Sequence, residues 1–106
     1  MYNYKVLIKR VIDGDTVIGM VDLGFGVSTE QRLRLGRINA PELSSGAGRV
    51  SYEALKGKIE GTTVMIDTVK DKRDVYGRYI ANITTLQGVD INAWLLSEGY
   101  AQLWTK

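Results

Sequence analysis

Hydrophobic and polar residues alternate along the first third of the chain, as in β-strands that are buried on one face. In the first such stretch, Tyr4, Val6 and Ile8 share one face. The dipeptide Asp13-Gly14, which follows this stretch, is a typical two-residue hairpin turn. We therefore predict three consecutive antiparallel strands, at residues 4–11, 16–23 and 28–38.

A helix and two further strands are predicted next. Residues 43–48 are mostly small or polar, which predicts a flexible loop. The apolar residues after this loop recur at helical spacing, as Val50, Ala54, Leu55 and Ile59. We predict a helix over residues 49–60 that ends at Gly61. Strands then follow at 62–69 and 79–83, joined by a polar loop at 70–78.

A second helix is predicted near the end of the chain. Asp90 or Asn92 can cap its N-terminus, and Gly99 can end it. Its expected buried face consists of Ile91, Trp94 and Leu95. Three strands, a helix, two strands and a closing helix favour a mainly β, α+β fold. The specific prediction is a five-stranded oligonucleotide-binding (OB) type barrel with one inserted helix and a C-terminal helix, formed by residues 1–106 as a single domain.

The composition limits the chemistry that this chain can perform. It has no cysteine and no histidine, so it has neither disulfides nor the commonest general base. Any hydrolytic chemistry must then use carboxylates, arginines and a hard cation such as Ca²⁺ or Mg²⁺. The net charge of +2 mildly favours a polyanionic partner. No apolar run is long enough to cross a membrane, and no signal segment opens the chain. We therefore expect a cytoplasmic protein, or a secreted one if the chain is a trimmed mature form.

Residues 32–42 gather charged and oxygen-bearing groups at the end of the third strand. Leu33 and Leu35 alternate with arginines, so Arg34 is expected on the face opposite the core, free to bind an anion. Pro41 should end the strand. Three oxygen donors remain at its end: the Asn39 amide, the Ala40 carbonyl and the Glu42 carboxylate. Such oxygens suit a hard cation.

Each of these candidates also has a purely structural interpretation. Asp15 belongs to a turn that needs no metal. Arg34 and Arg78, taken singly, are ordinary solvated charges. Tyr76 and Arg78 flank a glycine, which lets the backbone approach an anion that the guanidinium binds. If the three strands form a meander, Asp15 can lie near Asn39 and begin a Ca²⁺ site with it.

The order and spacing of these motifs resemble the staphylococcal nuclease (thermonuclease) family over nearly the whole chain. The matching motifs lie at residues 11–17, 34–42, 74–78 and 91–101. The resemblance implies an OB-type barrel with helices. It also implies Ca²⁺-dependent hydrolysis of phosphodiester bonds in DNA and RNA, leaving 3′-phosphate ends. We expect a monomer whose partner is nucleic acid, single strands being favoured.

The resemblance implies a metal site as well. Asp15 and Asn39 match the two side chains that bind Ca²⁺, and Ala40 matches a ligand that binds through its backbone carbonyl. Asn39 stands where the family has an aspartate, so the site has one fewer negative charge. Ca²⁺ affinity should therefore fall, or the preference should change to Mg²⁺ or another divalent cation.

The remaining matches concern catalysis and substrate binding. Glu42 matches the glutamate that activates or orients the attacking water. Arg34 and Arg78 match two arginines that clamp the phosphate, and Tyr76 matches a tyrosine that contacts a substrate phosphate. The alternative is a catalytically weak or inactive nuclease-like OB module that binds single-stranded nucleic acid, which Asn39 favours. Its candidate stacking residues are Tyr52, Tyr76, Tyr100 and Trp104.

Overall fold

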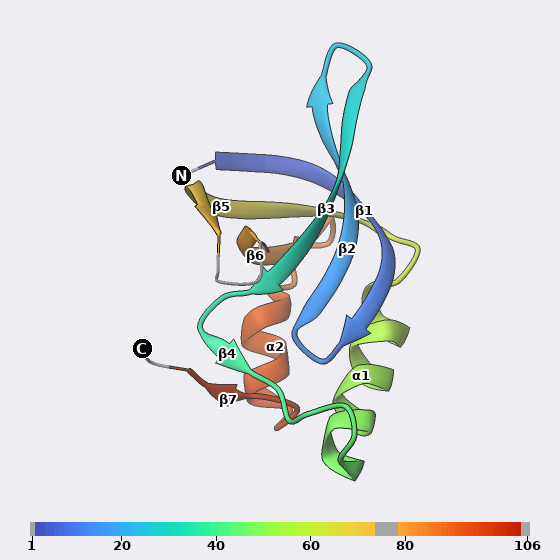
Figure 1. Cartoon of the computed structure of the whole chain (residues 1–106), viewed down its shortest axis with the longest axis vertical. Coiled ribbons are helices and arrows are strands. Elements are labelled where there is room, and N and C mark those ends of the chain that lie inside the picture. Colours follow the sequence, from blue (N-terminus) through green and yellow to red (C-terminus); the bar gives the residue numbers. More distant parts are fainter. Residues whose placement is uncertain (1, 74–78, 105–106) are drawn as a thin grey trace.

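Five strands close into a barrel in the computed structural model, which describes residues 2–73 and 79–104 (Figure 1). The strands are ordered β1-β2-β3-β6-β5, and β3 runs parallel to β6 while the other neighbours are antiparallel. The predicted five-stranded OB-type barrel is confirmed. Its strands are β1 (Tyr2–Asp13), β2 (Thr16–Gly24), β3 (Val27–Leu35), β5 (Thr63–Arg73) and β6 (Tyr79–Thr85).

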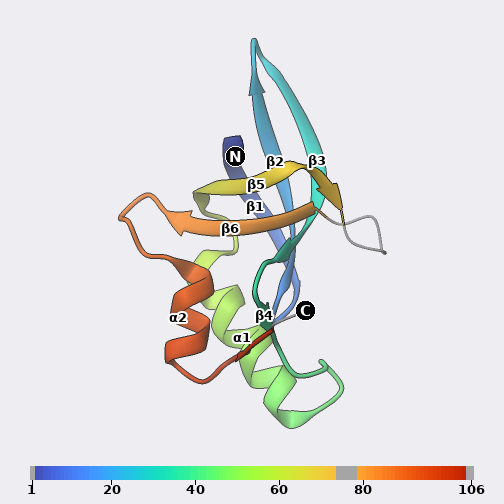
Figure 2. The same cartoon turned by 90° about the vertical axis from the view of Figure 1, so that its left-hand side faces the viewer.

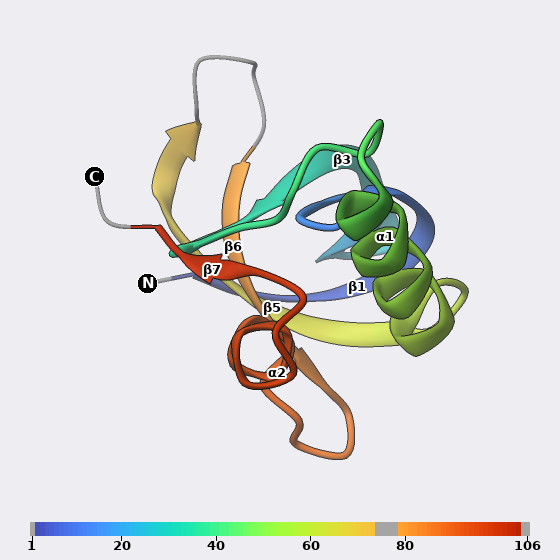
Figure 3. The same cartoon turned by 90° about the horizontal axis from the view of Figure 1, so that it is seen from below.

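Two helices and a small ribbon lie at one end of this barrel. Helix α1 (Gly46–Ile59) connects the ribbon to β5, and α2 (Ile91–Ser97) follows β6. The ribbon pairs β4 (Ile38–Asn39) with β7 (Gln102–Leu103), a strand that the sequence did not predict. Figure 2 shows the β2–β3 hairpin extending from the other end, and Figure 3 looks onto the end that carries the helices. No helix in the described part of the chain is long and apolar enough to span a membrane.

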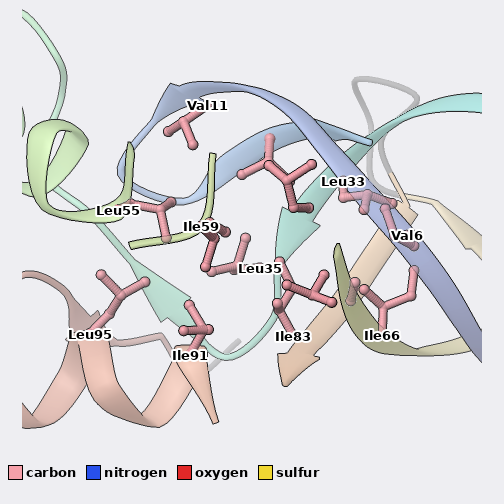
Figure 4. Close-up of a cluster of buried hydrophobic side chains, with 14 of the residues drawn as sticks. Val6, Val11, Leu33, Leu35, Leu55, Ile59, Ile66, Ile83, Ile91 and Leu95 are labelled. Carbon is pink, nitrogen blue, oxygen red and sulfur yellow. The ribbon is translucent and has the colours of Figure 1, made fainter. Parts of the chain in front are cut away.

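The core lies inside the barrel and continues between the barrel and the helices (Figure 4). Val6 and Ile8 are fully buried and Tyr4 packs against them, so the predicted face of β1 is confirmed. Leu33 and Leu35 on β3 also point into the core, as their alternation predicts. The helices contribute Leu55, Ile59, Ile91 and Leu95.

The first hairpin is shifted by one residue from its predicted position. Asp13 pairs with Thr16, so the two turn residues are Gly14 and Asp15. A Cβ atom at Gly14 would lie 2.7 Å from the Cβ of Ala40 and 2.8 Å from that of Ser51. Only glycine permits this close approach, which brings the turn against the segment that follows β4.

The third strand ends earlier than predicted, at Leu35. Gly36 still donates its N–H to the Ala81 carbonyl of β6, at 2.9 Å. The chain then turns at Arg37, whose φ is 65°, and Ile38 begins the separate strand β4. A left-handed residue breaks a strand, so this turn redirects residues 38–42 away from the barrel wall.

Helix α1 begins three residues before its predicted start. Ser45 caps it, because its hydroxyl accepts the N–H of Gly48 at 3.0 Å. The prediction of a flexible loop through residue 48 is therefore wrong at its end. Val50 is also 56% exposed, contrary to its predicted place on the buried face. The buried face consists of Gly48, Ser51, Leu55 and Ile59.

The second helix and the last two barrel strands agree more closely with prediction. Asp90 is the N-cap of α2, with its carboxylate accepting the N–H of Ala93 at 3.1 Å. Asn92 lies within the helix and is buried. Strand β5 continues to Arg73 and so includes part of the predicted loop at 70–78, of which residues 74–78 lie outside the described residues.

Candidate active site

Three segments that are distant in sequence meet where the β1–β2 turn contacts the end of β3 and the exit of β4. The Asp15 carboxylate accepts the Ala40 N–H at 2.9 Å through Oδ2. The Asp15 carbonyl accepts the Leu35 N–H, also at 2.9 Å. Arg34 Nη2 lies 3.5 Å from Asp15 Oδ2. The structure therefore brings together Asp15, Arg34 and the segment containing Asn39 and Ala40, as the predicted meander requires.

Arg34 fastens the end of β3 to β4. Its Nη1 donates to the carbonyls of Leu35 at 2.6 Å and Ile38 at 2.9 Å, and its Nη2 donates to Asn39 Oδ1 at 3.3 Å. The Trp104 ring centroid lies 5.1 Å from its Cζ. Arg34 is consequently only 5% exposed. The expectation of a guanidinium free to bind an anion is wrong for this structure, because these groups already surround it.

Asp15 is a buried carboxylate, with only 7% of its surface exposed. Burial raises its pKa above the ordinary value, and the hydrogen-bonded Asp13 carboxyl raises it further. The Ala40 N–H and the Arg34 guanidinium lower the pKa, with smaller effects. A cation beside this carboxylate would favour its ionised form and lower the pKa again.

The oxygen donors at this junction match a hard cation in chemical type. They are the Asp15 carboxylate, the exposed Asn39 amide and the carbonyl of half-buried Ala40. Among the side chains that the structure describes, no group of three or more Asp, Glu, His or Cys residues gathers to hold a metal ion. Asp15 is the one carboxylate among these three candidate ligands, so a cation held by them would need neutral oxygens and water to complete its coordination.

Glu42 has a fixed backbone and an exposed side chain. Its carbonyl accepts the Ser45 N–H at 3.0 Å and the Ser45 hydroxyl at 2.7 Å. A Cβ atom at Gly48 would collide with this carbonyl, so the first turn of α1 packs directly against it. The Glu42 carboxylate is thus carried on a rigid segment two residues after Ala40.

The other predicted site residues have different outcomes. Tyr76 and Arg78 lie outside the described residues. Of the candidate stacking residues, Trp104 is 42% exposed, while Tyr52 and Tyr100 are half-buried. The exposed part of the Trp104 ring lies at the edge of the site because the ring covers Arg34.

The sequence analysis did not predict the role of Asn92, a buried amide that hydrogen-bonds the backbone next to the site. Its Oδ1 accepts the Ile83 N–H at 3.1 Å, and its Nδ2 donates to the carbonyls of Gly36 at 3.0 Å and Ala81 at 3.2 Å. These bonds join α2 to β6 and to Gly36, the residue that follows β3. An amide next to the start of a predicted helix resembles an N-cap, which is how the sequence analysis interpreted Asn92, the second residue of α2.

Comparison with known proteins identifies related chains. A family described as staphylococcal nuclease homologue matches residues 32–106. The chain is 34% identical over 94 residues to an uncharacterized endonuclease of Escherichia coli O157:H7. The matched segment covers 89% of this chain and 57% of that protein. It is 26% identical over 107 residues to endonuclease YhcR of Bacillus subtilis strain 168, covering 93% of this chain and 9% of that protein. The chain thus spans little more than half of the first relative, and it belongs to the staphylococcal nuclease family.

Proposed function

We propose that this chain is a nuclease that hydrolyses phosphodiester bonds in DNA and RNA with the help of Ca²⁺, leaving 3′-phosphate ends. The observation that carries the proposal is the buried Asp15–Arg34 pair, held at 3.5 Å beside Asn39 and Ala40. The Glu42 carboxylate lies exposed on the same segment. Family membership and the names of two relatives as endonucleases support the same class of activity.

In the proposed reaction, Glu42 is the general base, because the chain has no histidine and this carboxylate is open to water. A water attacks the phosphorus, and its proton passes to the Glu42 carboxylate. The bond from phosphorus to the 5′ oxygen then breaks, and the 5′ oxygen takes up a proton from solvent to become a hydroxyl, which leaves the phosphate on the 3′ oxygen. Arg34 and Arg78 would stabilise the negative charge that develops on the phosphoryl oxygens.

Arg34 can take this role only through part of its guanidinium. Its Nη1 is engaged by two short hydrogen bonds to carbonyls, at 2.6 and 2.9 Å. Its Nη2 has the longer contacts, at 3.3 Å to Asn39 and 3.5 Å to Asp15. Longer contacts are the weaker ones, so Nη2 is the edge at which a phosphate oxygen would bind. The two carbonyl bonds meanwhile hold the group in place.

Asp15, Asn39 and the Ala40 carbonyl would hold the Ca²⁺ ion, and Mg²⁺ or another divalent cation is the alternative that Asn39 favours. When bound, the ion supplies positive charge close to the scissile phosphate. A bound cation would also balance the negative charge of the Asp15 carboxylate, whose pKa is raised by burial.

The test is a cleavage assay on single-stranded DNA and on RNA with Ca²⁺, with Mg²⁺ and with chelator. Wild type is compared with Glu42→Gln, a conservative change at an exposed position that should leave folding intact. We expect Ca²⁺-dependent cleavage that the variant loses by a factor of about 10² or more. Cleavage by wild type and variant at equal rates would remove Glu42 from the mechanism.

The alternative function is nucleic-acid binding without efficient cleavage. The observation that favours it is the single negative charge among the metal-binding candidates, since Asn39 supplies a neutral amide. No cleavage with any metal, together with a retained gel shift of single-stranded DNA, would establish this alternative instead.

A further inference from the structure

Basic side chains form a row across the outer face of β1, β2 and β3, which lie side by side (Figure 1). Arg10 on β1 pairs with Ile18 on β2, and Ile18 pairs with Arg32 on β3. Paired residues on neighbouring strands point to the same face of a sheet. Both arginines are exposed and Ile18 between them is half-buried. Their Cα atoms lie about 10 Å apart, two strand spacings.

An irregularity in β1 adds a third cation to this face. The pairing with β2 shifts by one residue between Ile8 and Arg10, as in a β-bulge. Lys9 and Arg10 are consecutive, yet both are exposed, whereas regular alternation would bury one of them. Lys9 forms an ion pair with Glu30 of β3 at 3.0 Å. That pair is neutral, so the positive charge of the row comes from Arg10 and Arg32.

The row is continuous with the candidate active site. Arg32 and Arg34 lie two residues apart on the same face of β3, about 7 Å from each other along the strand. Thr16, which follows Asp15, pairs with Arg34 just as Ile18 pairs with Arg32. A nucleic-acid strand with one phosphate bound at Arg34 would therefore meet Arg32 next, on the same β-strand. It would then cross β2 and meet Arg10 on β1.

The charges around the row leave both arginines available. Among the side chains that the structure describes, at residues 3–68 and 79–104, neither Arg10 nor Arg32 takes part in an ion pair. The nearby acids are engaged elsewhere: Glu30 binds Lys9, and Glu60 accepts the Val11 N–H at 2.9 Å. The corresponding outer face of strands 2 and 3 is where OB folds bind oligonucleotides.

We propose that Arg10 and Arg32 bind backbone phosphates of a single-stranded nucleic acid as it extends from the active site across β3, β2 and β1. Ile18 provides an apolar contact between the two phosphate positions. This inference rests on the proposed function, since it assumes that the site holds a phosphodiester. It adds a binding surface that a mononucleotide does not need and that a longer strand uses.

The test measures binding of a 15-nucleotide single-stranded DNA and of a dinucleotide by fluorescence anisotropy, in chelator so that cleavage is prevented. The variant is Arg10→Ala/Arg32→Ala. Two lost phosphate contacts should lower the slope of log affinity against log salt by about 1.4. If the electrostatic contribution vanishes near 1 M salt, affinity for the 15-mer falls about tenfold at 0.2 M and about 60-fold at 0.05 M. The gain in affinity from dinucleotide to 15-mer should shrink accordingly.

Lys56→Ala/Lys58→Ala is the matched control, because it removes the same charge from exposed positions on α1. It should bind the 15-mer as wild type does. The variant Arg10→Lys/Arg32→Lys should retain most of the salt dependence, since phosphate neutralisation needs only the charge. Thermal unfolding of each variant checks that the fold is intact.

Three outcomes would overturn the proposal. If Arg10→Ala/Arg32→Ala and Lys56→Ala/Lys58→Ala lose equal affinity for the 15-mer, total charge rather than this surface sets the affinity. An unchanged length dependence in Arg10→Ala/Arg32→Ala would place the strand elsewhere, while the cleavage test with Glu42→Gln still judges the nuclease independently. Binding of polyglutamate as tight as that of DNA, lost in the same variant, would indicate an acidic protein as the partner.

Discussion

Replacement of Arg34 should destabilise the fold strongly, because the guanidinium is buried against a buried carboxylate. Arg34→Met keeps the aliphatic part of the side chain and removes its charge and its donors. Asp15 then remains buried without its cation, and the carbonyls of Leu35 and Ile38 lose their hydrogen bonds. Breaking a buried ion pair in this way costs about 3–5 kcal/mol. For a domain of this size, such a loss lowers the unfolding temperature by more than about 12 °C.

The pH dependence of this loss identifies its cause. Burial already raises the pKa of Asp15, and Arg34 is one of the groups that lower it, so Arg34→Met should raise it further. A raised pKa means that the folded state holds the proton more tightly than the unfolded state. Stability of the variant should therefore rise as the pH falls from 7, and this gain is complete below about pH 4, the ordinary carboxyl pKa.

Urea unfolding at pH 7 and at pH 5, in chelator, measures both effects. The control is Asp15→Asn/Arg34→Met, which contains neither buried charge and should be more stable at pH 7 than Arg34→Met alone. The reasoning is refuted if Arg34→Met loses less than about 1 kcal/mol, or if the double variant is no more stable than the single one. Activity of Arg34 variants is informative only at temperatures where they remain folded.

Three further changes test the surroundings of the site. Asn39→Asp should tighten Ca²⁺ binding about tenfold or more by calorimetry, because it adds a negative charge beside a dication; unchanged affinity would show that residue 39 does not bind the ion. Asn92→Ala should lower the free energy of unfolding by about 2–4 kcal/mol, since it removes the side-chain partner of the buried Ile83 N–H and of the Gly36 carbonyl, while the Ala81 carbonyl keeps the N–H of Gly36. A loss below about 1 kcal/mol would mean that water replaces the amide. Gly14→Ala should cost about 1–3 kcal/mol in the same urea titration, because the new methyl group would lie 2.7 Å from the Ala40 Cβ. Wild-type stability would show that the β1–β2 turn moves freely.

The strands and the barrel could be predicted because their signal is local. The alternation of apolar and polar residues indicates which face of each strand is buried. The structure agrees at all five predicted positions, which are Tyr4, Val6, Ile8, Leu33 and Leu35. A short turn between the first two strands and a helix after the third then leave few alternatives to a barrel. The same logic brought Asp15 close to residues 39 and 40.

The burial of Arg34 could not be predicted, because its cover comes from elsewhere in the chain. Alternation correctly places Arg34 opposite the leucines, but it cannot state what lies on that side. The turn at Arg37 brings Ile38 and Asn39 over the guanidinium, and Trp104 arrives from the far end of the chain. The strand that positions Trp104 has two residues, which is too short to show any period.

The charges of Asp15, Arg34 and Asn39 sum to zero when no cation is bound. Asp15 and Arg34 carry opposite charges and lie 3.5 Å apart, and the neutral Asn39 amide accepts a hydrogen bond from the same guanidinium. An aspartate at the exposed position 39 would add a second anion to Asp15 and Arg34. The net charge of the three side chains would then be −1, which attracts a dication, and the two carboxylates would repel each other when no cation is bound. Asn39 therefore stabilises the metal-free fold at the expense of cation affinity. Calcium should consequently raise the unfolding temperature of Asn39→Asp more than that of wild type, because ligand stabilisation grows with the ratio of ligand concentration to dissociation constant.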